Sequence, residues 1–106
     1  MRAIIIANGE PPPPALARRV AASSDTLICA DGGVHAALAA GLRPDWVIGD
    51  LDSLDKQSLA DLARLGTRIR RYPISKEEID LELALLHAVE SGATEITILG
   101  ALGGRA

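Results

Sequence analysis

The sequence is poor in residues that several functional classes require. Its 106 residues include no phenylalanine, one tryptophan, one tyrosine and one cysteine. With so few aromatic side chains, a stacking platform for single-stranded nucleic acid is not expected. The net charge of −3 also argues against binding along a phosphate backbone. A lone cysteine excludes an internal disulfide, and we expect Cys29 to be a small buried hydrophobic residue.

Long hydrophobic runs are missing as well. No apolar stretch approaches the roughly 18 residues that cross a bilayer. The opening stretch from Met1 to Ala7 is too short for a signal peptide, and a proline-rich segment follows it where a cleavage site would stand. We therefore expect a cytoplasmic protein that binds neither membrane nor nucleic acid. A composition of 48% hydrophobic and 24% charged residues is typical of one globular domain.

The common nucleotide and metal fingerprints are absent too. The sequence has no Walker-type loop, and no Gly-x-Gly-x-x-Gly follows the first expected strand. His35 and His87 lack a cysteine or histidine partner at ligand spacing, so neither is expected to bind a metal.

Short apolar segments alternate with amphipathic ones along the chain. This pattern predicts an α/β fold, a Rossmann-like three-layer α/β/α arrangement with a mostly parallel sheet of about five to six strands. Gly41, Gly66 and Gly92 mark helix ends, and Ser75 with Glu78 forms a capping box. The expected strands are Arg2–Ala7, Thr26–Ala30, Trp46–Ile48, Arg68–Tyr72 and Glu95–Leu99. The expected helices are Ala15–Ser23, Val34–Ala40, Leu54–Leu65 and Lys76–Ser91.

The unusual residues follow the strands. In an open parallel sheet, ligands bind beyond the carboxyl ends of the strands, and all five of these loops open on the same edge. The segments after the five strands are Asn8-Gly9, Asp31-Gly32-Gly33, Gly49-Asp50-Leu51-Asp52-Ser53, Pro73 to Asp80, and Gly100 to Arg105. The loops at the opposite edge are plainer connectors, and we interpret Asp45 there as a turn residue beside Pro44.

Clustered carboxylates and glycines indicate a site for a divalent metal and phosphate. Asp50 and Asp52 can point into one pocket, where their charges repel unless a cation neutralises them. Magnesium prefers hard oxygen ligands and shares them with substrate phosphates. Glycines and helix amino termini let backbone N–H groups approach an anion, and Lys76 and Arg105 can hold phosphate oxygens.

A purely structural interpretation of the same residues remains open. Asp and Gly are common in turns. Asp52 or Ser53 could simply cap the following helix, and Asp80 could be a favourable charge in a first helical turn.

Four stretches together resemble the thiamine pyrophosphokinase family. They are Ala30 to Gly33, Pro44 to Ser53, Lys76 to Leu85 and Gly100 to Arg105. The resemblance covers nearly the whole chain. It implies that residues 1–106 form the family's N-terminal nucleotide- and magnesium-binding domain, and that a C-terminal β-sandwich that binds thiamine is absent from this chain.

The resemblance also implies an activity and a site. Enzymes of this family transfer diphosphate from ATP to the hydroxyl of thiamine, giving thiamine diphosphate and AMP, with Mg²⁺, as homodimers. It implies an acidic catalytic site, with metal ligands among its members, and a set of secondary contacts to the nucleotide. The catalytic residues would be Asp31, Asp50, Asp52 and Asp80, the last three being the metal ligands. The secondary contacts would be Asn8, Gly32, Gly33, Lys76, Gly103, Gly104 and Arg105.

Two departures and three alternatives accompany this resemblance. Ile79 stands where the family usually has a threonine, and Glu77 stands where it has an aspartate. The chain also stops at Ala106, so we expect it to be a fragment that is inactive alone. The alternatives are a pyrophosphokinase for another acceptor such as a hydroxymethylpterin, a receiver-like signalling module, and a nucleotide-binding domain without catalysis.

Overall fold

Five strands and four helices alternate along the described chain. The computed structural model describes residues 1–49, 54–71 and 77–100. Within the last range, only the backbone of residues 77–80 is described. The strands are β1 (Arg2–Ile6), β2 (Thr26–Ala30), β3 (Trp46–Gly49), β4 (Arg68–Arg71) and β5 (Glu95–Leu99). The helices are α1 (Pro14–Ala22), α2 (Gly33–Ala39), α3 (Lys56–Arg64) and α4 (Glu77–Glu90). Every bound lies within two residues of the sequence-based prediction.

The strands form one sheet in the order β4-β3-β2-β1-β5. All four neighbouring pairs are parallel. The chain winds outward from β1 to β4 and then returns to add β5 on the other side of β1. The topological switch point, where such sheets bind ligands, therefore lies at the carboxyl ends of β1 and β5. The predicted Rossmann-like α/β class is confirmed.

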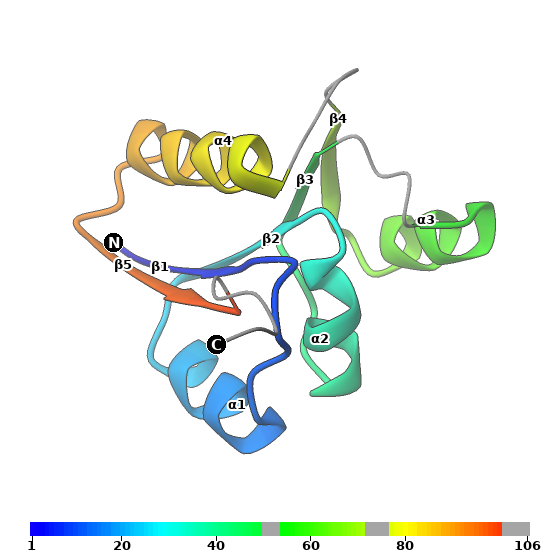
Figure 1. The fold of residues 1–106 in the computed structure, drawn as a ribbon, viewed down its shortest axis with the longest axis horizontal. Helices are drawn as coiled ribbons and strands as arrows, with labels where there is room; N and C mark the ends of the chain where they lie inside the picture. The colour runs from blue at the N-terminus through cyan, green and yellow to red at the C-terminus, as the bar shows by residue number, and fades with distance from the viewer. Residues whose placement is uncertain (50–53, 72–76, 101–106) are drawn as a thin grey trace.

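The helices cover the sheet on two sides (Figure 1). Helices α1, α2 and α3 lie on one face, and α4 lies alone on the other. Parallel crossovers are right-handed, so a crossover that reverses direction along the sheet must use the opposite face. The step from β4 back to β5 is that reversal, which is why α4 is separated from the other three helices.

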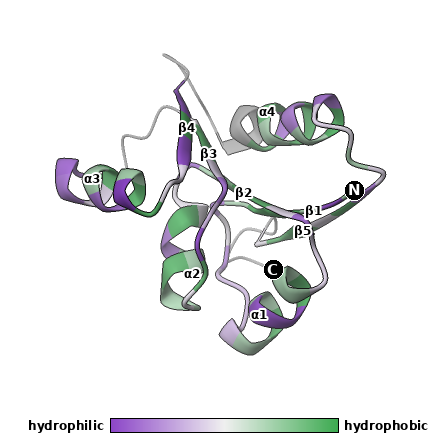
Figure 2. Ribbon diagram, turned by 180° about the vertical axis from the view of Figure 1, so that it is seen from behind, coloured by the Kyte–Doolittle hydropathy of each residue, from purple (hydrophilic) through white to green (hydrophobic). Residues whose placement is uncertain are grey.

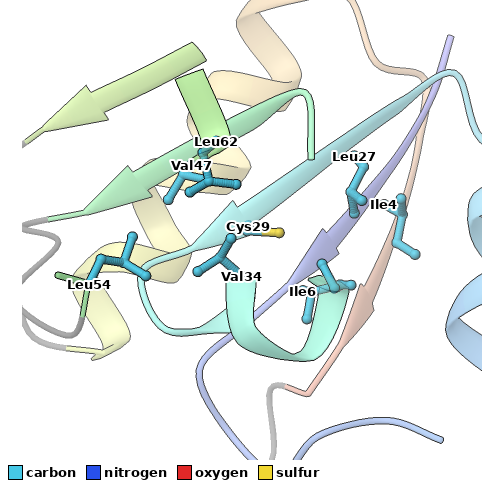
Figure 3. Packing of buried hydrophobic residues seen from close by; sticks show 9 residues of the cluster. Ile4, Ile6, Leu27, Cys29, Val34, Val47, Leu54 and Leu62 are labelled. Atoms are coloured by element: carbon cyan, nitrogen blue, oxygen red, sulfur yellow. The ribbon is translucent and has the colours of Figure 1, made fainter. Parts of the chain in front are cut away.

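Alternate side chains of the central strands lie in two separate hydrophobic cores, one on each face of the sheet. Ile4, Ile6 and Cys29 belong to the core on the face covered by α1, α2 and α3 (Figure 3), whereas Ile5 and Ile28 belong to the core under α4. All five are fully buried. Because both faces are covered, the strands lack a polar face. Burial, aided by the negative charge of Asp45, raises the pKa of the Cys29 thiol, which therefore stays protonated in the core.

The N-cap of α3 excludes one alternative that the sequence left open. The N-cap of α3 is Asp55, whose carboxylate accepts a hydrogen bond from the Ser58 N–H at 2.7 Å. This bond lowers the pKa of Asp55 below its ordinary value. Asp52 and Ser53 are therefore not the cap of this helix. Helix α3 starts later than expected because Asp55 satisfies its first free N–H groups.

Hydropathy is unevenly distributed over the elements (Figure 2). Strand β4 is hydrophilic, with three arginines at one edge of the sheet. Charges of this kind discourage pairing with another strand. Helices α1 and α3 show polar residues on the side away from the sheet. Among the described residues, no helix combines the length and the apolar character needed to traverse a lipid bilayer.

Candidate functional site at the carboxyl ends of the strands

The loop after β2 packs directly on the end of β1. A Cβ atom on Gly33 would lie 2.1 Å from the carbonyl oxygen of Ile6, and one on Gly32 would lie 2.4 Å from Oδ1 of Asn8. Both distances are far inside van der Waals contact. At Gly33 the neighbour is backbone, so only glycine allows this approach, whereas a Cβ at Gly32 would require the Asn8 side chain to move. The two glycines at the start of α2 thus bring this helix terminus against the Asn8 side chain.

The loop after β5 reaches the same place. Gly100 adopts a φ of +70°, and a Cβ there would lie 2.9 Å from the carbonyl oxygen of Ala7. The Ala7 N–H donates a hydrogen bond to the Leu99 carbonyl at 2.8 Å. The ends of β1, β2 and β5 therefore meet around residues 7–9, at the topological switch point.

Asp31 holds an unfavourable backbone conformation at this rim. It is the only residue other than glycine with a positive φ, 44°, among the described residues. Its N–H donates a hydrogen bond to the Ile48 carbonyl at 2.7 Å, which joins the ends of β2 and β3. Its side chain is half-buried. Strained residues of this kind persist where the surrounding structure fixes them and are concentrated at functional sites.

Four of the predicted site residues are gathered by these contacts. Asn8, Asp31, Gly32 and Gly33 lie together at the carboxyl ends of β1 and β2. Strand β3 ends at Gly49, immediately before Asp50, and is paired with β2. The backbone of Asp80 lies in the first turn of α4.

The remaining predicted residues lie outside the described residues. They are Asp50, Asp52, Lys76, Gly103, Gly104 and Arg105. The side chain of Asp80 is likewise outside, as is the Ser75–Glu78 capping box. Within the described side chains, no group of three or more acidic, histidine or cysteine residues could hold a metal ion. The metal site stays a prediction from the sequence.

Two residues have roles that the sequence pattern did not indicate. Asp45, interpreted as a turn residue, accepts a hydrogen bond from the Leu27 N–H through its carboxylate at 2.7 Å. His87, expected to have no special role, is buried beside Trp46, with ring centroids 4.3 Å apart. Both contacts join segments far apart in sequence, so no local spacing could have revealed them.

The fold and this rim define the class of the protein. An open parallel α/β sheet with a switch point, glycine-lined loops and a strained aspartate at its carboxyl end is typical of doubly wound ligand-binding domains. The family model described as "Thiamin pyrophosphokinase, catalytic domain" matches residues 17–106. The chain belongs to the thiamin pyrophosphokinase family.

Individual relatives agree with this assignment. A curated thiamine pyrophosphokinase from Bacillus subtilis (strain 168) is 36% identical over 76 residues, which are 72% of this chain and 36% of that protein. The crystal structure of a thiamin pyrophosphokinase family protein from Enterococcus faecalis superposes with a TM-score of 0.73 at 30% identity, covering 99% of this chain and 49% of that one.

A second solved structure gives the same picture. The thiamine pyrophosphokinase from Bacillus subtilis superposes with a TM-score of 0.71 at 29% identity and covers the whole of this chain. The chain spans about half the length of these solved relatives, 49% and 50%. The similarity therefore concerns one half of a longer architecture.

Proposed function

We propose that this chain is the nucleotide- and magnesium-binding half of a thiamine pyrophosphokinase. The observation that carries the proposal is the convergence of Asn8, Asp31, Gly32 and Gly33 at the switch point of the sheet. These are residues that the family resemblance assigns to the nucleotide site. The product of the complete polypeptide would be thiamine diphosphate, formed from ATP and thiamine with release of AMP.

The described residues suit a polyphosphate at this rim. Gly32 and Gly33 begin α2, where backbone N–H groups can approach an anion without obstruction by a Cβ. The Asn8 amide lies against Gly32 and offers both a donor and an acceptor. These neutral groups can orient phosphate oxygens, while the acidic residues are left to hold cations.

The carboxylates expected at the rim suit Mg²⁺. Asp50, Asp52 and Asp80 would hold the ion, since hard carboxylate oxygens together with substrate phosphates form its preferred ligand set. When bound, Mg²⁺ would neutralise phosphate charge. Asp31 would lie beside these ligands. The amino terminus of α2 at Gly33 would hold the nucleotide so that the thiamine hydroxyl can attack the β-phosphorus in line with the leaving group.

The acceptor site belongs to the part of the architecture that this chain does not span. In this proposal the second half supplies the thiamine pocket, and the complete enzyme works as a cytoplasmic homodimer. The 106-residue chain alone is then expected to bind ATP with Mg²⁺ weakly and to make no thiamine diphosphate. Robust thiamine diphosphate production by the chain alone would contradict this division of roles.

A product assay tests the proposal. The complete polypeptide that contains this chain is incubated with thiamine, ATP and Mg²⁺, and the nucleotide product is identified by chromatography. AMP formed in equal amount with thiamine diphosphate supports diphosphate transfer, whereas ADP would indicate a phosphate-transferring kinase. A parallel reaction with a hydroxymethylpterin in place of thiamine tests the acceptor, and turnover of the pterin alone would overturn the thiamine assignment.

A further inference from the structure

A buried histidine connects α4 to the two strands that lead toward the acidic loops. The side chain of His87 is 8% exposed. Its ring lies against the indole of Trp46 on β3, with centroids 4.3 Å apart and planes inclined by 58°. Its Nδ1 lies 3.4 Å from Nη1 of Arg70 on β4. One side chain of α4 therefore contacts both β3 and β4.

The contacts define the protonation state of this histidine. A guanidinium group only donates hydrogen bonds, so Nδ1 of His87 must be the acceptor toward Arg70. The ring is then neutral and carries its proton on Nε2, a buried atom with no hydrogen-bond partner among the described residues. Burial first, and the charge of Arg70 second, lower the pKa of His87, with Glu90 acting in the opposite direction.

Protonation would place a new charge in a setting that already contains cations. Arg70 faces the ring from β4, and Arg68 lies over the other partner, with its guanidinium carbon 5.7 Å from the Trp46 ring centroid. Glu90 on α4 is the acidic group that acts on the ring. A buried imidazolium beside Arg70 is repelled, so protonation weakens the contact between α4 and the two strands.

This contact lies between the two segments that carry the proposed metal ligands. Helix α4 packs on β2 and β3, and its first turn contains Asp80. Asp80 precedes His87 by seven residues, about 10 Å along a helix. Strand β3 begins at Trp46 and ends one residue before Asp50. The His87–Trp46 contact thus joins the helix bearing Asp80 to the strand that leads to Asp50.

We propose that neutral His87 is a positioning residue that seats α4 against β3 and β4, and that its protonation loosens this seat and weakens nucleotide binding. The first half of this inference concerns the fold alone. The second half rests on the proposed function.

Trp46 provides a direct probe, because it is the only tryptophan in the chain. A protonated imidazole in contact with indole quenches its fluorescence. As the pH is lowered, we expect the tryptophan emission of the 106-residue chain to fall in one step. The midpoint should lie below pH ~6.5, the ordinary pKa of histidine. The step should vanish in His87→Gln and move to higher pH in Arg70→Met. His35→Gln, at the exposed histidine of α2, is the matched control and should leave the step unchanged.

Three results would each contradict the seating claim. One is a fluorescence step that persists in His87→Gln. Another is a His87 ring that titrates at or above its ordinary pKa in a nuclear magnetic resonance titration of the unmodified chain, which needs no variant to fold. Amide exchange of residues 81–90, compared with that of α1, should also accelerate on protonation, and equal behaviour of both helices would contradict the inference.

The claim that protonation of His87 weakens nucleotide binding is tested on the complete polypeptide. The KM for ATP with Mg²⁺ should rise below the His87 midpoint by at most about tenfold per pH unit, the limit for one proton. In His87→Gln, which cannot be protonated, the KM should not rise over the same pH range. If the fluorescence changes with pH but the KM for ATP does not rise over the same pH range, protonation of His87 is not coupled to nucleotide binding. Absence of ATP binding at every pH would instead contradict the proposed function and leave the fluorescence result to decide the seating claim.

Discussion

The two rims of the sheet use aspartate in different ways. At the amino ends of the strands, the Asp25 carboxylate accepts a hydrogen bond from the Arg2 N–H, and the Asp45 carboxylate accepts one from the Leu27 N–H, both at 2.7 Å. At the carboxyl ends, Asp31 has a strained backbone with a φ of 44°, beside glycines at which a Cβ would clash. Asp25 and Asp45 join strands through their carboxylates, whereas Asp31 is maintained at a cost in stability.

This difference teaches how to separate structural from functional carboxylates. Asp45 also donates its N–H to the Leu27 carbonyl and accepts from the Arg68 N–H, so it joins the starts of three strands. A residue so thoroughly used by the backbone needs no ligand to explain it. A strained residue beside closely packed glycines points to a ligand, and this is the basis for proposing a function at the carboxyl rim.

The largest effect should come from the acidic loop after β3. Asp50→Asn or Asp52→Asn in the complete polypeptide should lower turnover by about 10²-fold or more, because each removes several kcal/mol of metal-assisted stabilisation. Steady-state kinetics with thiamine and ATP measures this. Asp45→Asn, at the opposite rim, is the control and should retain most of the turnover. Near-normal activity of the first two variants would remove them from the site.

The close packing at the carboxyl rim should be sensitive to a single methyl group. Gly33→Ala forces a Cβ against the Ile6 carbonyl and should lower the free energy of unfolding by about 1–3 kcal/mol, as overpacking does. Thermal denaturation followed by circular dichroism measures it. Gly41→Ala is a control in which φ is +75° but no atom lies within 4 Å of the new Cβ. If Gly33→Ala cost less than this control, the two loops would not be in contact.

At the amino rim, the effect should appear in stability alone. Asp45→Ala leaves the Leu27 N–H without its partner and should cost about 1 kcal/mol, at the lower end for a bond to a charged group because the site is half-exposed. Asp45→Asn keeps an acceptor oxygen and should cost less. Denaturant titration compares the two. Equal stability of the alanine variant and the unmodified chain would show that this carboxylate is not structural.

The opposite outcome is expected at Asp31. Replacement by glycine relieves the positive φ and should leave stability unchanged or raise it by up to about 1 kcal/mol. Binding of ATP with Mg²⁺ should nevertheless weaken. Thermal denaturation and calorimetry on the same samples separate the two effects. A clear loss of stability in Asp31→Gly, with unchanged binding, would mean that Asp31 is structural like Asp45.

Much of the architecture follows from local pattern in the sequence. The five apolar segments became the five strands, and Gly41, Gly66 and Gly92 end their helices with a positive φ, as expected. Parallel order then places every strand end on one rim, so the position of Asp31 and Gly32 could be predicted. Local periodicity and simple topology carry this information.

Contacts between distant side chains could not be predicted in this way. The spacing of Trp46 and His87 indicates nothing, because their contact depends on how α4 crosses the sheet. The cap of α3 could not be assigned from the sequence because Asp52, Ser53 and Asp55 are all suitable capping residues, and only the chain path selects Asp55. The side chains of the acidic loop after β3 lie outside the described residues, so their gathering stays a prediction.

Calorimetry on the folded 106-residue chain tests the central claim most directly. ATP is titrated in the presence and in the absence of Mg²⁺, with circular dichroism as the check on folding. The account predicts weak binding heat that requires Mg²⁺ and disappears in Asp50→Asn. Folded protein that gives no magnesium-dependent heat with ATP would contradict the claim that the carboxyl rim holds a cation and a polyphosphate together.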